Sequence, residues 1–356
     1  MEPRCGRPVE ASGIRILESL FTAPGRVECA PRAISGASIP VSRSSESVGQ
    51  LQQWLATEVI GQENLVERLL IALLADGHLL VEGAPGLAKT RAIRQLARGI
   101  ECDFQRIQFT PDLLPSDITG TDIYRPEDGS FRFQRGPIFH NLVLTDEINR
   151  APAKVQSALL EAMAERQVSI GGTTYELPPL FLVMATQNPI EQEGTYPLPE
   201  AQLDRFLMHV RVGYPEREAE REILRLARRE AAEHPGVPPA VLSQEAVFGA
   251  RAEILSLHMA EPVEEYIIHL ALATRGNATL RQWLDYGASP RGTIALDRCA
   301  RAHAWLHGND FVAPANVQAV VHDVLRHRLI LNFDAEAAGM STDGVIDELL
   351  NCVPVA

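Results

Sequence analysis

The residues of this chain best suited to chemistry form one turn at positions 83–90, which reads Gly-Ala-Pro-Gly-Leu-Ala-Lys-Thr. The apolar run His78-Leu79-Leu80-Val81 precedes this turn, and a helical pattern over 91–98 follows it. In a strand, loop and helix order, loop N–H groups and the helix N-terminus converge on one point and attract an anion. Lys89 adds a mobile cation for phosphate oxygens, and Thr90 adds a hydroxyl for Mg²⁺. The turn therefore predicts a phosphate-binding loop.

Two features of this region leave alternatives open. The strict phosphate-loop pattern has glycine immediately before the lysine, and here that position is Ala88. A glycine-rich turn with an incidental lysine is the other interpretation of these eight residues. Upstream, Val59-Ile60-Gly61-Gln62 interrupts a helical pattern and is either a simple helix-helix turn or a contact for adenine. The candidate nucleotide-binding residues are thus Ile60, Gly61, Gly83, Ala84, Pro85, Gly86, Leu87, Ala88, Lys89 and Thr90.

A second cluster ends the apolar run Leu142-Val143-Leu144, where Thr145 is followed by Asp146 and Glu147. An aspartate at the carboxyl edge of a strand can hold Mg²⁺, and a neighbouring glutamate can orient and deprotonate an attacking water. Acidic residues are also common at helix starts. Because a strand leads into both clusters, the pair favours nucleotide hydrolysis, with Thr90 and Asp146 as candidate metal ligands.

Three further candidates are weaker when taken singly. Asn188 follows the apolar run 180–184 and is expected at the same sheet edge, where ligands of open α/β folds collect. An Asn before Pro189 is also an ordinary turn residue. Arg205 and Arg291 are candidate catalytic arginines, although lone arginines usually form surface salt bridges.

The elements that must position these residues are strands alternating with helices, which predicts a parallel sheet with helices on both faces. Two hairpins are expected within this unit, one around a Pro-Glu-Asp-Gly turn at 126–129 and one around Gly171-Gly172. Beyond Tyr214-Pro215 only helical patterns follow. The expected strands are 78–81, 104–109, 142–144, 180–184 and 207–212.

The predicted organisation has four parts. Residues 1–46 lack any sustained apolar period and are expected to be a disordered extension, or to lie upstream of a start nearer Gln50. An α/β nucleotide-binding domain spans 47–214, a helical domain spans 215–333, and a weakly ordered tail spans 334–356.

The bulk composition narrows the class of protein. Its 356 residues allow two domains. No apolar run approaches the ~20 residues of a membrane helix, and the five cysteines show no paired metal or redox spacing. We therefore expect a cytoplasmic protein without membrane insertion. The net charge of −13 disfavours nonspecific nucleic-acid binding.

Longer motifs carry a resemblance to a known family. They are 83–90 and 146–152 (Asp-Glu-Ile-Asn-Arg-Ala-Pro), 156–163 (Gln-Ser-Ala-Leu-Leu-Glu-Ala-Met), the long stretch 185–206, and Ala-Ser-Pro-Arg at 288–291. Together they resemble the MoxR family of AAA+ ATPases, of the helix-2-insert clade, over about 50–331. Alanine before the loop lysine is usual in that family, which favours the phosphate-loop interpretation.

The resemblance implies a fold and a set of roles. The fold is an AAA+ core with a five-stranded parallel sheet flanked by helices, and a smaller all-helical lid domain. The two hairpins would be the helix-2 insert and the pre-sensor-1 hairpin, which usually face the centre of a ring. The implied roles are Lys89 and Thr90 as Walker A, Asp146 and Glu147 as Walker B, Asn188 as sensor 1, Arg205 as an arginine finger for a neighbouring subunit, and Arg291 as sensor 2 in cis or in trans.

The function implied is an ATP-hydrolysing homo-oligomer that uses ATP and Mg²⁺, expected as a hexameric ring. It would act like a chaperone in remodelling or maturing a protein client, with a von Willebrand factor A domain adapter as partner. One alternative is a nucleic-acid translocating motor, which the acidic charge and the lack of Lys or Arg at the hairpin tips disfavour. The other is a nucleotide-dependent scaffold, which has no need of Glu147.

Overall fold

The computed structural model describes residues 43–189, 194–232, 238 and 240–355. Most of the extension predicted to be disordered, 1–42, lies outside the described residues. Helix α1 (Arg43–Glu58) includes residues 43–46, so helical structure is present before the predicted domain boundary at 47. Val48, Leu51 and Leu55 of this helix are buried in the core, which explains why the helix forms this early.

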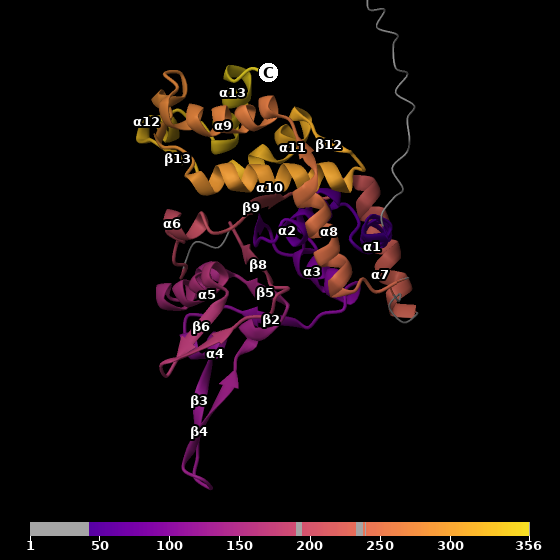
Figure 1. The fold of residues 1–356 in the computed structure, drawn as a ribbon, viewed down its shortest axis with the longest axis vertical. Coiled ribbons are helices and arrows are strands. Elements are labelled where there is room, and N and C mark those ends of the chain that lie inside the picture. Colours follow the sequence, from indigo (N-terminus) through magenta and orange to yellow (C-terminus); the bar gives the residue numbers. More distant parts are fainter. Residues whose placement is uncertain (1–42, 190–193, 233–237, 239, 356) are drawn as a thin grey trace, which may run out of the picture. The chain divides into compact units, whose positions relative to one another are not determined.

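A five-stranded parallel sheet forms the centre of the fold, as predicted (Figure 1). Its strand order is β2-β5-β8-β1-β9, and every neighbouring pair is parallel. Because strand order differs from chain order, the carboxyl ends of β1, β5 and β8 are neighbours at one edge. The strands are β1 (Leu79–Gly83), β2 (Phe104–Gln108), β5 (Leu142–Asp146), β8 (Leu182–Gln187) and β9 (Met208–Val212).

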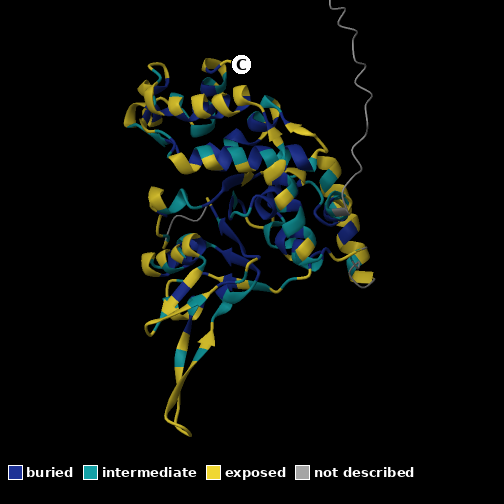
Figure 2. Cartoon of the chain, viewed as in Figure 1, coloured by how far each residue is buried: buried dark blue, intermediate teal, exposed yellow. Residues whose placement is uncertain are grey.

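Both faces of the sheet are covered by helices, so alternate strand residues enter two different hydrophobic clusters. Leu79 and Val81 point into the cluster built with α1, α2 and α3, whereas Leu80 points into the cluster built with α4 and α5. Figure 2 shows the sheet buried between these layers. The covering helices are α2 (Glu63–Leu74), α3 (Lys89–Arg98), α4 (Pro115–Thr119) and α5 (Ala153–Glu165).

Both predicted hairpins are confirmed. The first pairs β3 (Gly120–Arg125) with β4 (Ser130–Arg135), and the second pairs β6 (Gln167–Ile170) with β7 (Thr173–Glu176). Phe133 stacks on Tyr175 with ring centroids 4.1 Å apart, so the two hairpins pack against each other near their bases. The far end of β3–β4 extends beyond the sheet, and its side chains are mostly exposed (Figures 1 and 2).

After β9 the chain is mainly helical, with two small exceptions to the predicted all-helical lid. Strand β10 (His258–Met259) pairs with β12 (Phe311–Val312), and β11 (Leu284–Tyr286) pairs with β13 (Ile330–Leu331). These short pairs join the loops between helices. The helices are α6 (Glu200–Leu203), just before β9, and then α7 (Arg217–Ala232), α8 (Gln244–Ser256), α9 (Glu261–Gly276), α10 (Pro290–Leu306) and α11 (Pro314–Leu325).

The prediction of a weakly ordered tail over 334–356 is wrong for the residues described there. Helix α12 (Phe333–Ala337) and helix α13 (Thr342–Cys352) occupy it. Ser341 caps α13 by accepting a hydrogen bond from the Gly344 N–H at 3.1 Å. Val345, Ile346 and Leu349 are buried, and α13 contacts α9 and α11. The apolar stripe is short, so only tertiary packing makes this helix stable.

Ion pairs with little solvent exposure hold the lid on the core. Arg68 of α2 lies 2.7 Å from Asp323 of α11, and both side chains are almost fully buried. Arg326 lies 2.7 Å from Asp343 and donates to the carbonyl of His209 in β9. None of the described helices is long and apolar enough to cross a membrane.

Candidate functional site

The predicted phosphate loop lines a pocket of about 390 Å³ at the carboxyl edge of the sheet. Within the loop, Gly86 has φ +83° and Ala88 has φ +58°, so both occupy the left-handed region. Glycine has no Cβ penalty there, which explains why the usual pattern has glycine at the position of Ala88. The alanine adopts the same backbone shape and leads directly into α3. The loop geometry thus agrees with a phosphate-binding turn.

Lys89 and Thr90 begin α3 and line the same pocket. The Nζ of Lys89 donates to the carbonyl of Gly83 at 2.6 Å and to that of Gln187 at 3.3 Å. Burial lowers the pKa of this ammonium, while Asp146, Glu147 and Glu82 oppose the shift. A half-buried cation bonded only to neutral carbonyls is well placed to exchange them for phosphate oxygens.

Asp146 is the last residue of β5, Glu147 follows it, and both line the pocket. Asp146 is buried, and Thr186 donates to its Oδ1 at 3.2 Å. Glu147 has φ +57°, a strained conformation for a residue with a side chain, and its N–H donates to the Thr186 hydroxyl at 3.0 Å. Strain of this kind is characteristic of residues whose orientation matters for function.

Asn188 completes the set, because it is buried at the end of β8 and lines the pocket. The structure thus brings Lys89, Thr90, Asp146, Glu147 and Asn188 to one place. An ammonium, a hydroxyl and two carboxylates around a pocket of this size fit a magnesium-bound nucleoside triphosphate.

Two further pocket residues, on β2, were not predicted from the sequence. The Nε of Arg106 lies 2.6 Å from Oδ2 of Asp146, and the Gln108 amide donates to Glu147 at 2.9 Å. Both carboxylates expected to serve the metal and the attacking water therefore already have partners from the neighbouring strand. Because side chains alternate along β2, these two residues lie on the same face of the strand. Only the strand order shows that β2 pairs with β5, which brings them beside Asp146 and Glu147.

Ile60 and Gly61 do not line this pocket. Gly61 has φ +73°, and a Cβ on it would lie 2.8 Å from Ala219 and 2.9 Å from Pro215. The glycine is therefore required for the close approach of α7, which agrees with the helix-helix turn. Contact of either residue with adenine remains a prediction.

Arg205 and Arg291 lie together in a second cleft, of about 380 Å³, and neither lines the phosphate pocket of its own chain. Arg205 follows α6, and its buried Nε has no hydrogen-bond partner among the described residues. Ser289 caps α10 and, with Pro290 at the first helical position, places Arg291 in the first turn. The Nη1 of Arg291 is 4.0 Å from Oδ2 of Asp204, which accepts from the Ser289 hydroxyl at 2.8 Å, while Oδ1 accepts from Nε of Arg328 at 2.8 Å.

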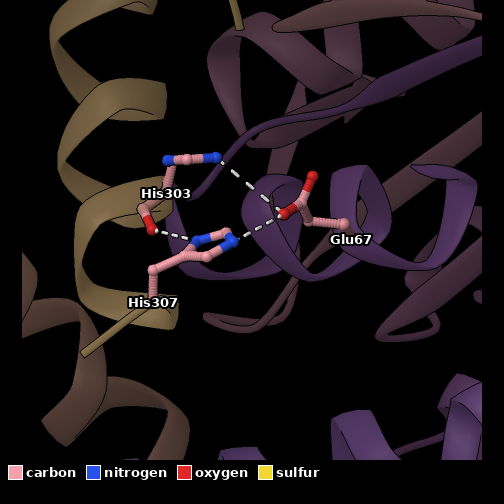
Figure 3. Close-up of side chains that lie close together, drawn as sticks. All are labelled: Glu67, His303 and His307. Atoms are coloured by element: carbon pink, nitrogen blue, oxygen red, sulfur yellow. Dashed lines mark hydrogen bonds and ion pairs between the residues drawn. The ribbon is translucent and has the colours of Figure 1, made fainter. Parts of the chain in front are cut away.

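One further group of side chains has the composition of a metal site. Glu67 of α2 faces His303 of α10 and His307, which directly follows α10, at 3.9 and 3.4 Å (Figure 3). Asn316 accepts from the Ala313 N–H and donates to Nδ1 of His303, so the hydrogen of that ring is on Nε2, facing Glu67. In this tautomer Nε2 of His303 offers no lone pair, so a metal ion would have to displace its hydrogen. The three side chains form a polar contact between lid and core.

The sheet order, the phosphate loop and the acidic pair after β5 define a P-loop ATPase of the AAA class. The sequence model of the ATPase family associated with various cellular activities matches residues 78–208, and that of the AAA lid domain matches residues 278–349. The second match includes most of α13, in agreement with the ordered tail.

Individual relatives agree with this class. Chaperone MoxR1 of Mycobacterium tuberculosis is 43% identical over 98% of this chain and 91% of its own length. The uncharacterized protein YeaC of Bacillus subtilis is 42% identical over 86% of this chain and 94% of its own. A solved structure assigned as an ATPase, from Cytophaga hutchinsonii, is 45% identical, with a TM-score of 0.81 over 88% of this chain and 96% of its own. This chain belongs to the MoxR family of AAA+ ATPases.

Proposed function

We propose that this protein hydrolyses ATP with Mg²⁺ and that its sites are completed between subunits of a ring. The observation that carries the proposal is the separation of the catalytic set into two places. Lys89, Asp146 and Glu147 line one pocket, while Arg205 and Arg291 line another. A chain with this arrangement supplies its arginines to a neighbouring copy.

The pocket residues have distinct tasks in this proposal. Lys89 leaves the carbonyls of Gly83 and Gln187 for phosphate oxygens, and the loop N–H groups before α3 hold the same phosphates. Thr90 and Asp146 hold Mg²⁺, which when bound neutralises charge on the phosphates. In this proposal the ion pair between Asp146 and Arg106 breaks when the carboxylate turns to the metal ion.

Glu147 orients and deprotonates the attacking water, and Asn188 contacts that water or the terminal phosphate. The structure holds Glu147 through Gln108 and Arg150, at 2.9 and 3.1 Å. In this proposal the carboxylate exchanges one of these contacts for the attacking water when the nucleotide is bound. An arginine supplied in trans stabilises the developing charge and contributes ~10³–10⁵ in rate.

At the level of biological role, we propose a chaperone-like factor that remodels or matures a protein client in the cytoplasm. The name of the M. tuberculosis relative supports the chaperone role. A hexameric ring and an adapter with a von Willebrand factor A domain belong to the same proposal. A protein client fits the acidic net charge of −13 better than a nucleic acid does.

One observation favours the alternative of a nucleic-acid motor. The tips of the hairpins lack Lys and Arg, but the sides of β3–β4 carry exposed Arg125, Arg132 and Arg135 beside exposed Tyr124 and Phe131. Cations next to aromatic rings can bind single strands. Stimulation of ATPase activity by single-stranded DNA, lost when the three arginines are replaced by glutamine, would favour the motor.

The proposal is tested by measuring the ATPase rate per subunit against protein concentration, with oligomer size read by light scattering in the same samples. The rate should rise as the ring assembles. Arg205→Ala protein should be inactive alone and regain activity when mixed with Lys89→Ala protein, because the mixture contains some complete sites. A rate that is equal in monomer and ring, or mixed rings without recovery, would contradict the shared site.

A further inference from the structure

The cleft that contains Arg205 and Arg291 carries more positive charge than those two residues explain. Five arginines and two aspartates line it, with His78 held neutral because burial lowers its pKa to about 4. The cleft therefore has a net charge of about +3 from its lining. The lining arginines are Arg166, Arg205, Arg291, Arg298 and Arg328.

Both acidic residues of the cleft already have close partners. Asp76 pairs with Arg166 at 2.7 Å and with Arg251 at 2.6 Å. Asp204 pairs with Arg328 at 2.8 Å and accepts from Ser289. These pairs neutralise Arg166 and Arg328, so the unbalanced charge of the cleft rests on the other three arginines.

Of these three arginines, Arg205 and Arg291 are the candidate catalytic residues, and Arg298 is the one without a proposed function. It is exposed on α10, and its side chain has no ion pair or hydrogen bond with any described residue. It follows Arg291 by seven residues, which places both on the same helix face, roughly 10 Å apart along the axis. Exposed Ile294 lies between them and lines the same cleft.

We propose that Arg298 is a third arginine acting in trans, which binds phosphate groups of the nucleotide held by a neighbouring copy of this chain. This inference rests on the proposed shared site. Guanidinium groups bind phosphate oxygens in bidentate fashion. Two arginines two turns apart on one rigid helix can contact different phosphate groups of one ligand. Arg298 thus contributes to nucleotide affinity, whereas Arg205 contributes to turnover.

The test compares Arg298→Ala and Arg298→Lys with the wild type in fully assembled rings. We expect Arg298→Ala to raise KM for ATP about tenfold and to lower kcat much less than Arg205→Ala does. Arg298→Lys should recover part of the affinity. The matched control is Arg281→Ala, an exposed lid arginine outside the cleft, which should change neither value.

Two measurements separate binding in trans from a structural effect. Binding of a fluorescent ATP analogue to Glu147→Gln rings should weaken about tenfold on adding Arg298→Ala, with oligomer size unchanged. At ATP well below the raised KM, mixing Arg298→Ala with Lys89→Ala protein should restore activity, because the second protein supplies an intact cleft. Unchanged KM and analogue affinity, or a raised KM that mixing does not correct, would overturn the proposal.

The Arg205→Ala variant distinguishes failure of the Arg298 proposal from failure of the proposed shared site. If Arg205→Ala is inactive while Arg298→Ala equals the wild type, only the role of Arg298 is wrong. If Arg205→Ala is fully active, the shared site itself is wrong.

Discussion

The carboxylate of Asp204, in the core, lies 2.8 Å from Nε of Arg328, in the lid. The guanidinium also donates to the carbonyls of Phe206 and Leu207, and its side chain is only 2% exposed. Asp204 precedes Arg205 and lies 4.0 Å from Arg291. This ion pair, in which Arg328 is buried and Asp204 is partly exposed, therefore helps to set how the two candidate catalytic arginines are placed relative to each other.

Asp204→Asn should lower both stability and activity. Removing one partner of a buried pair leaves Arg328 uncompensated, which costs about 3–5 kcal/mol in the free energy of unfolding. Urea unfolding measures that loss, and the ATPase rate should fall toward that of Arg205→Ala. The control is Asp297→Asn, which breaks a more exposed pair with Arg301 and should cost less than about 1 kcal/mol. Equal losses in both variants would contradict the anchoring role.

Lys89→Ala and Glu147→Gln should separate binding from turnover. The lysine variant loses the cation for phosphate oxygens, so nucleotide binding measured by calorimetry should disappear. The glutamine variant keeps the shape of the pocket but lacks the base, so it should bind ATP normally and hydrolyse it at least ~100-fold more slowly. Turnover by Glu147→Gln at the wild-type rate would reassign the base.

Arg106→Gln should lower the Mg²⁺ concentration needed for half-maximal ATPase activity. In the structure Arg106 occupies Asp146, the candidate metal ligand, at 2.6 Å. The arginine side chain is 48% exposed, so the competition is worth at most about 1 kcal/mol, or roughly a fivefold shift. Titration of Mg²⁺ at fixed ATP checks this. A higher Mg²⁺ requirement would show instead that Arg106 helps to hold the metal-bound nucleotide.

Acid should destabilise the fold through His78. Its ring accepts from the Val183 N–H at 3.0 Å, and burial lowers its pKa from 6.5 to about 4. The unfolded chain therefore binds a proton at His78 near pH 6.5, whereas the folded chain binds it only near pH 4. The free energy of unfolding consequently falls as the pH drops through this window. The loss between pH 7 and 5 is about 2 kcal/mol from this residue.

Urea unfolding at the two pH values measures this loss. His78→Gln should be less stable at pH 7 but should lose less on acidification. An identical pH dependence in both proteins would assign the effect to other groups, such as His327, whose pKa burial also lowers.

Local sequence was enough to predict the sheet and a set of residues that line one pocket, the candidate nucleotide site. The phosphate loop, the Asp146-Glu147 pair and the five strands are each contiguous, and their apolar runs and turn residues act over a few positions. Parallel topology then requires the strand ends to meet at one edge. The two hairpins were predictable for the same reason, because each is closed by a short turn of its own.

Tertiary structure decided what depends on residues far apart in the chain. The contact of Arg106 with Asp146 needs the order of β2 and β5, and the helix α13 needs the surfaces of α9 and α11. The cleft brings Arg205 together with Arg291 and Arg298, up to 93 positions later in the chain, because lid and core are packed together by contacts such as that of Arg328 with Asp204. Long-range packing and ion pairs leave no periodic pattern in the local sequence. The sequence by itself therefore predicted the contiguous motifs that line the pocket, whereas only the tertiary structure showed which distant residues, such as Arg106, contact them.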